Sequence, residues 1–493
     1  MLSTAEKLRM NIAGSTPRSH KSALGQFMTP AGVASFMAGL FQSRSGPFRL
    51  LDPGAGLGAL TCATLDRWKA GGLGEGDISL EVHELDQRLR LHLEETLAAY
   101  EALGIPTRVN GGDYLSAAAA DIERGRTHFT HAILNPPYKK INTESDARKL
   151  ARRVGLETVN LYSAFVGLAL TQLREGGQLV AIIPRSFCNG PYYKPFRRFL
   201  LERAALRHIH LFDSRTQAFR DDDVLQENVI LLLERGAEQG DVCVSVSTDD
   251  SFADLRERSV PFAQVVKPHD KEAFIHISGD EGADPLENSP YIAATLAELG
   301  VVVSTGPIVD FRMREHLMDM PTKSTVPLLY PAHFTGSQMT WPIEGMKKAN
   351  AIERNQETER WLYPVGAYTV VRRFSSKEER RRVVASMVLP EAMGNPERIG
   401  FENHLNVFHE AKRGLPEALA WGLFAYLNST AVDSHFRRFN GHTQVNATDL
   451  RNIRYPSRQA LICLGEWARH HPNLAQSTID EHLGQLLRLE QTM

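Results

Sequence analysis

The chain has 493 residues, of which 42% are hydrophobic and 23% are charged, and its formal net charge is −2 at pH 7. This length predicts two or three domains with ample core material. The near-neutral balance excludes binding to a polyanion through overall charge, so such a partner needs basic residues gathered on one face. The apolar runs are too short to cross a membrane and no basic-then-apolar leader opens the sequence, so we expect a cytoplasmic protein.

The first half of the chain alternates short apolar runs with amphipathic stretches, which is typical of a doubly wound α/β sheet. Strands are expected over residues 49–52, 78–83, 131–134, 179–183, 209–212 and 229–233. Helices are expected over residues 30–42, 57–70, 87–103, 159–173 and 194–202. The pattern loosens after about residue 236, so we expect a first domain over 1–245 and a second over 246–493.

The first motif along the chain is Phe27-Met28-Thr29-Pro30. Thr followed by Pro is a good helix start, because the Thr29 hydroxyl can cap free N–H groups while Pro occupies the first turn. The Phe27-Met28 pair before it predicts either the wall of a ligand site or a hydrophobic staple.

A glycine-rich turn, Asp52-Pro53-Gly54-Ala55-Gly56, follows the first expected strand and precedes a helix. Glycines let the backbone pass close to a ligand, and the helix N-terminus favours a negative group such as a carboxylate. Asp52 adds an acid at the carboxyl end of the strand, where α/β sheets bind ligands.

Two further acids follow strand ends. Glu84 ends the second strand and can accept both hydroxyls of a ribose, although a solvated charge is the alternative. Asp113 follows the expected third strand and can accept a hydrogen bond from an adenine amino group, or can simply serve a turn. Together with the glycine turn, they predict a site for an adenosine that carries a carboxylate.

The motif Asn135-Pro136-Pro137-Tyr138 follows an apolar run. Its prolines fix φ and leave no N–H, so the Pro136 carbonyl is expected to point outward beside the Asn135 side-chain oxygen. Two such acceptors can draw the nitrogen of a planar amino group out of its ring plane and expose its lone pair, while Tyr138 stacks on the ring. The four residues can also form an ordinary turn.

In this order, the motifs resemble those of S-adenosylmethionine-dependent DNA adenine-N6 methyltransferases, and more narrowly the γ class of type II restriction-modification systems. The resemblance covers residues from about 20 to 235. It implies a Rossmann-like methyltransferase domain over 1–245 and a mixed α/β target recognition domain over 246–493. It also implies that Phe165 packs on the cofactor adenine, and that Phe219 stacks on the flipped target base opposite Tyr138. The implied cofactor-binding residues are Phe27, Thr29, Asp52, Pro53, Gly54, Gly56, Glu84, Asp113 and Phe165.

The C-terminal half contains Leu427-Asn428-Ser429 and Asp449-Leu450, which resemble segments of the recognition domains of such enzymes. Basic runs accumulate around them. Each run alone is usually a solvated face, but several interleaved with aromatics fit a groove that grips phosphates. The residues expected to bind DNA are Lys139, Lys140, Arg372, Arg373, Arg437 and Arg438.

The sequence therefore predicts an enzyme that rotates an adenine out of duplex DNA and methylates its N6, with Asn135, Pro136 and Tyr138 as catalytic residues. We expect a monomer, a cognate restriction endonuclease as a separate functional partner, and no metal. The four cysteines lie far apart without a CxxC pair, so neither a zinc cluster nor a disulfide framework is expected. Cytosine-N4 methylation, protein glutamine methylation and a non-catalytic DNA-recognition subunit remain as alternatives.

Overall fold

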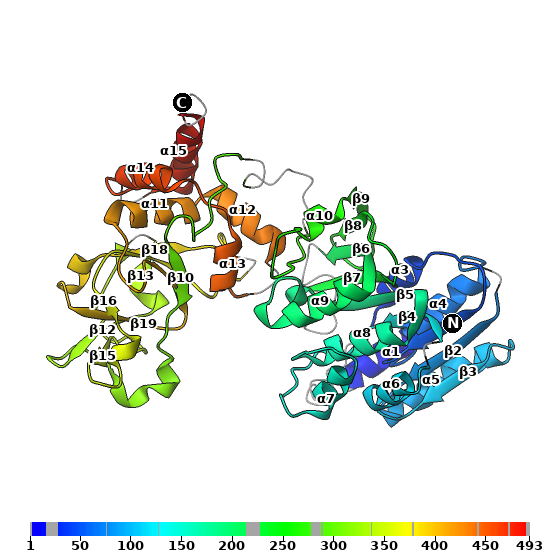
Figure 1. The fold of residues 1–493 in the computed structure, drawn as a ribbon. Coiled ribbons are helices and arrows are strands. Elements are labelled where there is room, and N and C mark those ends of the chain that lie inside the picture. Colours follow the sequence, from blue (N-terminus) through cyan, green and yellow to red (C-terminus); the bar gives the residue numbers. More distant parts are fainter. Residues whose placement is uncertain are drawn as a thin grey trace. The chain divides into compact units, whose positions relative to one another are not determined.

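The computed structural model describes residues 2–15, 28–74, 76–126, 128–212, 227–277, 286, 289–336, 338–376, 379–440, 443–471 and 474–489. The chain forms two compact units, Met1–Gly279 and Asp280–Met493 (Figure 1). The division falls later than the expected 245/246 boundary, because two further strands, β8 (Val242–Ser247) and β9 (Arg256–Val260), extend the sheet of the first unit.

The first unit contains a nine-stranded sheet with the order β3-β2-β1-β4-β5-β7-β6-β8-β9. Strands β7 and β9 run antiparallel to the others. Besides β8 and β9, the sheet contains β1 (Phe48–Asp52), β2 (Ile78–His83), β3 (Thr107–Asn110), β4 (Phe129–Leu134), β5 (Leu173–Pro184), β6 (Ala204–Phe212) and β7 (Asn228–Arg235). Each predicted strand lies within one of these, so the doubly wound α/β fold is confirmed.

Helices cover both faces of this sheet. Because side chains alternate along a strand, Leu50 and Leu51 of β1 are both fully buried but belong to different core clusters. The cluster around Leu50 includes α3 (Ala31–Gly39), α4 (Ala59–Lys69) and α5 (Gln87–Glu101). The cluster around Leu51 includes α6 (Tyr114–Glu123), α7 (Asp146–Arg153), α8 (Leu161–Gln172) and α9 (Lys194–Arg203). The described part of the unit also contains the helices α1 (Leu2–Ser15) and α10 (Phe262–Val265).

The strand order reverses between β1 and β4. From β1 the chain moves outward to β2 and β3, then returns to place β4 on the other side of β1. Open α/β sheets bind ligands in the crevice at the carboxyl ends of the strands at such a reversal. The glycine turn after β1 and Asn135 after β4 therefore meet at this crevice.

The second unit is mixed α/β, as expected. Its four-stranded sheet contains β10 (Val302–Thr305), β20 (Leu405–His409), β17 (Tyr368–Arg372) and β18 (Ala385–Val388). Its five-stranded sheet contains β11 (Leu317–Met318), β15 (Ala351–Glu353), β12 (Thr325–Leu329), β19 (Arg398–Phe401) and β16 (Tyr363–Pro364). A two-stranded sheet pairs β13 (Phe334–Thr335) with β14 (Gln338–Met339).

The helices of the second unit are α11 (Glu417–Leu427), α12 (Thr430–Phe439), α13 (Ala447–Asn452), α14 (Arg458–Ala468) and α15 (Gln476–Leu489). Helices α11 and α14 cross closely because each has a glycine at the crossing. A Cβ atom on Gly465 would lie 1.7 Å from the Ala418 carbonyl oxygen, and one on Gly422 would lie 1.9 Å from that of Leu461. Within the described residues, no helix is long and apolar enough to cross a membrane.

Candidate active site

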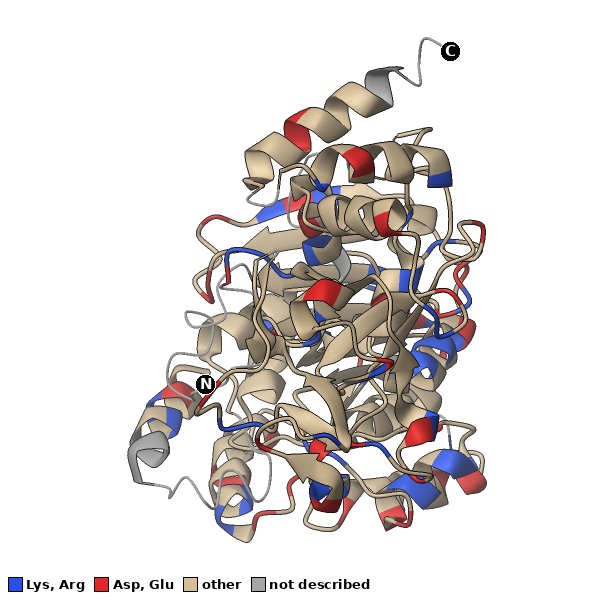
Figure 2. Ribbon diagram, turned by 90° about the vertical axis from the view of Figure 1, so that its left-hand side faces the viewer, with Lys and Arg blue, Asp and Glu red and all other residues tan. Residues whose placement is uncertain are grey.

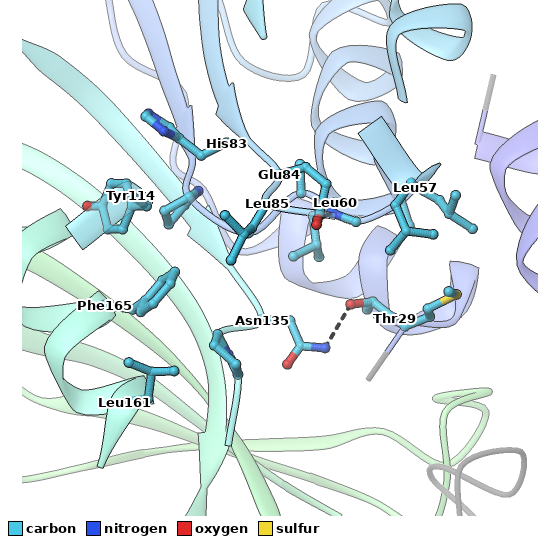
Figure 3. Close-up of a pocket in the computed structure, with 18 of the residues that line it drawn as sticks. Thr29, Leu57, Leu60, His83, Glu84, Leu85, Tyr114, Asn135, Leu161 and Phe165 are labelled. Atoms are coloured by element: carbon cyan, nitrogen blue, oxygen red, sulfur yellow. Dashed lines mark hydrogen bonds between the residues drawn. The ribbon is translucent and has the colours of Figure 1, made fainter. Parts of the chain in front are cut away.

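A pocket of about 290 Å³ lies at the carboxyl ends of β1, β2 and β4 (Figure 3). It brings together predicted residues from six separate segments. These are Thr29, Pro53, Gly54, Gly56, Glu84, Asp113, Asn135, Lys139 and Phe165. The predicted residues Asp52, Pro136, Tyr138 and Lys140 are absent from the lining of this pocket. Phe27 and Phe219 lie outside the described residues.

The glycine turn and Glu84 form one hydrogen-bonded unit. Glu84 is only 6% exposed, and its two carboxylate oxygens accept the backbone N–H groups of Gly56 and Asp86, each at 2.8 Å. Burial raises the pKa of Glu84, and these two hydrogen bonds oppose that rise. Gly56 has a φ of +56°, a conformation that favours glycine. The carboxylate is thus fixed between two loops, and its oxygens can accept further hydrogen bonds from a ligand.

Asp52 lies below this turn instead of in the pocket wall. Its side chain is fully buried, and Oδ2 accepts the Thr61 hydroxyl at 2.7 Å. Thr61 belongs to the first turn of α4, so the pair ties the end of β1 to the start of that helix. Burial raises the pKa of Asp52 to about 7.

Asp113, at the start of α6, and Phe165 of α8 also line the pocket. Asp113 caps α6, where its Oδ2 accepts the backbone N–H and the hydroxyl of Ser116 at 3.0 and 2.6 Å. Asp113 therefore caps a helix and also lines the pocket. The Phe165 ring lies 5.1 Å from the Tyr114 ring, centroid to centroid, and faces the pocket in Figure 3.

The Asn135 carboxamide is held from two sides. Its Nδ2 donates to the Thr29 hydroxyl at 3.1 Å, as the dashed line in Figure 3 marks. The Tyr138 hydroxyl lies 3.1 Å from Asn135 Oδ1 and 3.2 Å from the Ile182 carbonyl oxygen, and it donates toward both. These contacts fix the plane of the carboxamide at the pocket wall.

The expected capping role of Thr29 is wrong. Helix α3 begins after Pro30. Neither the side chain of this proline nor the Thr29 hydroxyl caps the helix. The Glu6 carboxylate of α1 accepts the Ala31 N–H at 3.1 Å instead. Because an acid from another helix satisfies this N–H, the Thr29 hydroxyl is available to Asn135.

Tyr138 is half-buried beside a second tyrosine. Its ring lies 6.1 Å from that of Tyr162 in an edge-to-face arrangement, and burial raises its pKa. The phenol is therefore neutral and can donate to Asn135. Packing against Tyr162 sets the position of the Tyr138 ring.

Helix α1 supplies pocket residues that the sequence did not reveal, Ala5 and Arg9. Arg9 is 5% exposed and makes a bidentate ion pair with Glu6, at 2.8 and 3.0 Å. No local pattern marks these residues, because their role depends on contacts with α3 and α4, which follow much later in the chain. Further lining residues that the sequence did not indicate include His83, Leu85, Leu89, Tyr114 and Leu161. Met28 lines the pocket, as expected of a residue in the wall of a ligand site.

The basic residues expected to bind DNA in the second unit have internal partners. Arg372 pairs with Glu379. Arg437 pairs with Asp433 at 2.7 Å and also donates to the Glu379 carbonyl at 2.8 Å, so Arg372 and Arg437 lie around one segment. Arg373 donates to a backbone carbonyl at 3.3 Å, and Arg438 is half-buried. Figure 2 shows basic and acidic residues interspersed along the ribbon.

Three polar residues of the second unit are buried and hold its elements together. Arg382, in the basic run Arg380-Arg381-Arg382, is fully buried and donates to Asn440 at 2.9 Å, so it does not belong to a solvated face. Asn428 bonds the backbone N–H and carbonyl of Ala385 at 3.2 and 3.0 Å. Asp449 is fully buried, and burial raises its pKa to about 7.

Comparison with known proteins extends over the whole chain. Type II methyltransferase M.BsuBI of Bacillus subtilis is 49% identical over 497 residues, which cover 99% of this chain and 98% of that protein. Type II methyltransferase M.PstI of Providencia stuartii is 41% identical over 480 residues, which cover 95% and 94%. The family model of the Eco57I restriction-modification methylase matches residues 95–219.

A solved structure has the same fold at low sequence identity. The DrdV–DNA complex aligns with a TM-score of 0.52 and 13% identity, over 95% of this chain and 59% of that one. Because its relatives over nearly the whole chain are methyltransferases, the doubly wound sheet with its strand-end pocket is a methyltransferase fold. The chain belongs to the type II restriction-modification methyltransferases.

Proposed function

We propose that the protein is a γ-class, site-specific DNA methyltransferase that transfers a methyl group from S-adenosylmethionine to the N6 of an adenine. One observation carries this proposal. The oriented carboxamide of Asn135 lines the same pocket as the glycine turn and the fixed carboxylate of Glu84. A site for an amino group therefore adjoins a site for an adenosine.

The residues of the pocket fit an adenosine with an amino-acid tail. Glu84 offers acceptors for the two ribose hydroxyls. Phe165 and the exposed Leu85 offer apolar surfaces for the purine, and Asp113 offers an acceptor for its amino group. When bound, S-adenosylmethionine supplies a methyl group on a positively charged sulfur.

Arg9 is the residue that we assign to the carboxylate of the tail. It is a buried cation in the pocket wall, and a guanidinium has five donors, so it can hold Glu6 and a second carboxylate together.

Asn135 acts by orientation and polarisation. Its Oδ1 and the Pro136 carbonyl accept the two N–H groups of the target amino group, which brings the nitrogen lone pair out of the ring plane. Thr29 and Tyr138 hold the carboxamide, so little reorganisation is needed as the bond forms. The excess proton on the methylated nitrogen leaves to solvent afterwards.

Duplex DNA is the proposed partner, with the target adenine flipped between Tyr138 and Phe219. Lys139 and Lys140 are exposed beside the motif and offer phosphate contacts, and residues 280–493 would supply target recognition. A cognate restriction endonuclease, a cytoplasmic location and a monomeric state complete the proposal.

Sequencing that detects modified bases in DNA from expressing cells tests this function. We expect N6-methyladenine at a single recognition sequence, and none in cells that express Asn135→Ala. Modified cytosine at that sequence would support the cytosine-N4 alternative. Unmodified DNA would leave protein glutamine methylation or a non-catalytic recognition subunit.

A further inference from the structure

A second group of chemically active side chains lies away from the pocket, on β6, β8 and β9. A ring nitrogen of His208, the Sγ of Cys243 and a carboxylate oxygen of Glu257 lie within 4.8 Å of one another. In the sheet, His208 is paired with Cys243, and Glu257 is paired with Ser245, two residues beyond Cys243. Side chains two residues apart on a strand share a face, so the three ligand atoms converge there.

A buried chain of hydrogen bonds fixes the protonation of His208. The Ser247 hydroxyl donates to the Asp249 carbonyl at 2.8 Å, because a carbonyl oxygen only accepts. Its oxygen then accepts from His210 Nε2 at 3.2 Å, which leaves His210 Nδ1 to accept the Ser245 hydroxyl at 2.9 Å. The Ser245 oxygen in turn accepts the Nε2–H of His208 at 2.6 Å.

This order requires His210 to be neutral, because its Nδ1 accepts a hydrogen bond. His208 donates through Nε2, so its neutral imidazole has the lone pair on Nδ1. A histidine whose other nitrogen donates to a fixed acceptor is the usual arrangement for a metal ligand.

We propose that His208, Cys243 and Glu257 bind a zinc ion, with His208 coordinating through Nδ1. Imidazole nitrogen, thiolate sulfur and carboxylate oxygen are the ligand types that zinc takes in proteins. A thiolate and a carboxylate also balance the charge of a divalent ion, and water fills the fourth position. The ion joins three neighbouring strands, so its role is to stabilise this end of the sheet.

Proton balance is simple at this site. A free cysteine side chain is a protonated thiol near neutral pH. Binding forms the Zn–S bond and releases the thiol proton to solvent. Cys243 is half-buried and Glu257 exposed, so an ion can reach them from solvent.

Sequence spacing did not indicate this site, because its ligands come from three strands and only one is a cysteine. The alternative to metal binding is that Cys243 is only a small core side chain and Glu257 only a solvated charge. The site lies about four strand spacings from β4, roughly 20 Å across the sheet. Its occupancy can therefore be measured without reference to methyl transfer.

The test is a cobalt titration of the full-length protein after treatment with a chelator. Co²⁺ replaces Zn²⁺ in such sites, and a thiolate ligand gives a charge-transfer band in the near ultraviolet. We expect this band to saturate at one equivalent in the wild type, to disappear in Cys243→Ser, and to persist in the control Cys463→Ser. The proposal is overturned if the wild type develops no such band. It is also overturned if the band is lost in Cys463→Ser but kept in Cys243→Ser.

Two further variants separate a built site from a chance thiol contact. Ser245→Ala removes the acceptor that orients His208, so we expect cobalt affinity to fall roughly 10- to 100-fold. Glu257→Gln is expected to weaken cobalt binding at least as much as Ser245→Ala does. The exposed control Glu101→Gln is expected to leave cobalt binding unchanged. Added zinc should raise the Tm of the wild type but not that of Cys243→Ser. Equal affinities in all variants would contradict the assignment of ligands.

Discussion

At the scale of single residues, the position of Asn135 depends on one partner that is distant in sequence and one that is close. Thr29 precedes it by 106 residues, and the Tyr138 hydroxyl reaches both its side chain and a carbonyl of β5. Two hydrogen bonds on opposite ends of a carboxamide remove its freedom to rotate. A side chain held in this way loses little entropy when it binds an amino group, which is the condition for catalysis by orientation.

Asn135→Ala is expected to lower kcat by roughly 10²- to 10³-fold or more, because an oriented polar group that polarises the reacting atom is lost. Cofactor affinity should stay within a few-fold, since Glu84 and the glycine turn are unchanged. Single-turnover methylation and calorimetric cofactor binding measure the two effects. The exposed Asn142→Ala is the matched control. Retention of kcat within ten-fold of the wild type would contradict the polarisation argument.

Asp449 provides a prediction about stability. Burial raises its pKa from 3.8 to about 7, so between these values the folded chain keeps a proton that the unfolded chain has released. The free energy of unfolding therefore falls as the pH rises from about 4 to about 7. Asp449→Asn has no such proton, so its stability should improve relative to the wild type over this range.

Tryptophan fluorescence during urea unfolding can follow this change, because Trp341, Trp361, Trp421 and Trp467 all lie in the second unit. The exposed Asp319→Asn should leave the slope with pH unchanged. If the free energies of unfolding of the wild type and Asp449→Asn differ by the same amount at every pH, Asp449 is ionised in the folded state and the prediction is wrong.

Individual residues differ in how far the sequence could predict them. Glu84, Gly56 and Asn135 stand directly after buried strands, so the sheet alone brings them to one edge. Asp52 also ends a strand, but Thr61 of α4 holds it below the turn, and the sequence pattern does not distinguish these outcomes. Asn428 is similar, because its amide pairs with a strand that is known only from the structure.

At the scale of elements, α1 contributes most beyond what sequence patterns indicate. Its Glu6 caps α3, and its Arg9 and Ala5 line the pocket. Periodicity locates a helix, but the surface on which that helix packs is set by tertiary contacts. Similarly, β9 carries the polar run Arg256–Val260, which shows little strand-like alternation and is formed through its pairing with β8.

We expect Arg9→Ala to weaken binding of S-adenosylhomocysteine roughly 10- to 100-fold, because a charge-assisted contact to its carboxylate is lost. Binding of 5′-methylthioadenosine, which lacks that carboxylate, should change little. Calorimetry on both ligands measures the difference, with Lys7→Ala on the same helix as the control. An equal loss for the two ligands would mean that Arg9 only supports the fold of the pocket.

The segment after the Asn-Pro-Pro-Tyr motif gives a prediction about DNA. Lys140 is exposed there, and its backbone pairs with Asn160, which fixes the segment against the start of α8. If Lys140 contacts a phosphate, Lys140→Ala should reduce the slope of log K against log salt concentration by about 0.9. Fluorescence anisotropy at several salt concentrations measures this slope. Lys69→Ala, at the far end of α4, should not change it, and an unchanged slope in Lys140→Ala excludes the contact.

At the scale of the whole molecule, the two units differ in how readable they are from sequence. The first follows the regular alternation of strands and helices, so its fold class and the site at its strand reversal could be predicted. The second is built from strands of two to five residues, whose pairing depends on contacts far apart in the chain. Periodicity carries little information over such lengths. The strands β8 and β9 are also short, so the sequence did not place them in the first sheet, and the boundary between the two units lies later than expected.

The atom that receives the methyl group defines the proposed function. Purified protein incubated with duplex DNA of mixed sequence and S-adenosylmethionine, followed by digestion and mass spectrometry of the nucleosides, identifies that atom directly. We predict that N6-methyldeoxyadenosine forms with the wild type and is absent with Asn135→Ala. N4-methyldeoxycytidine, or no methylated nucleoside from active, folded protein, would contradict it.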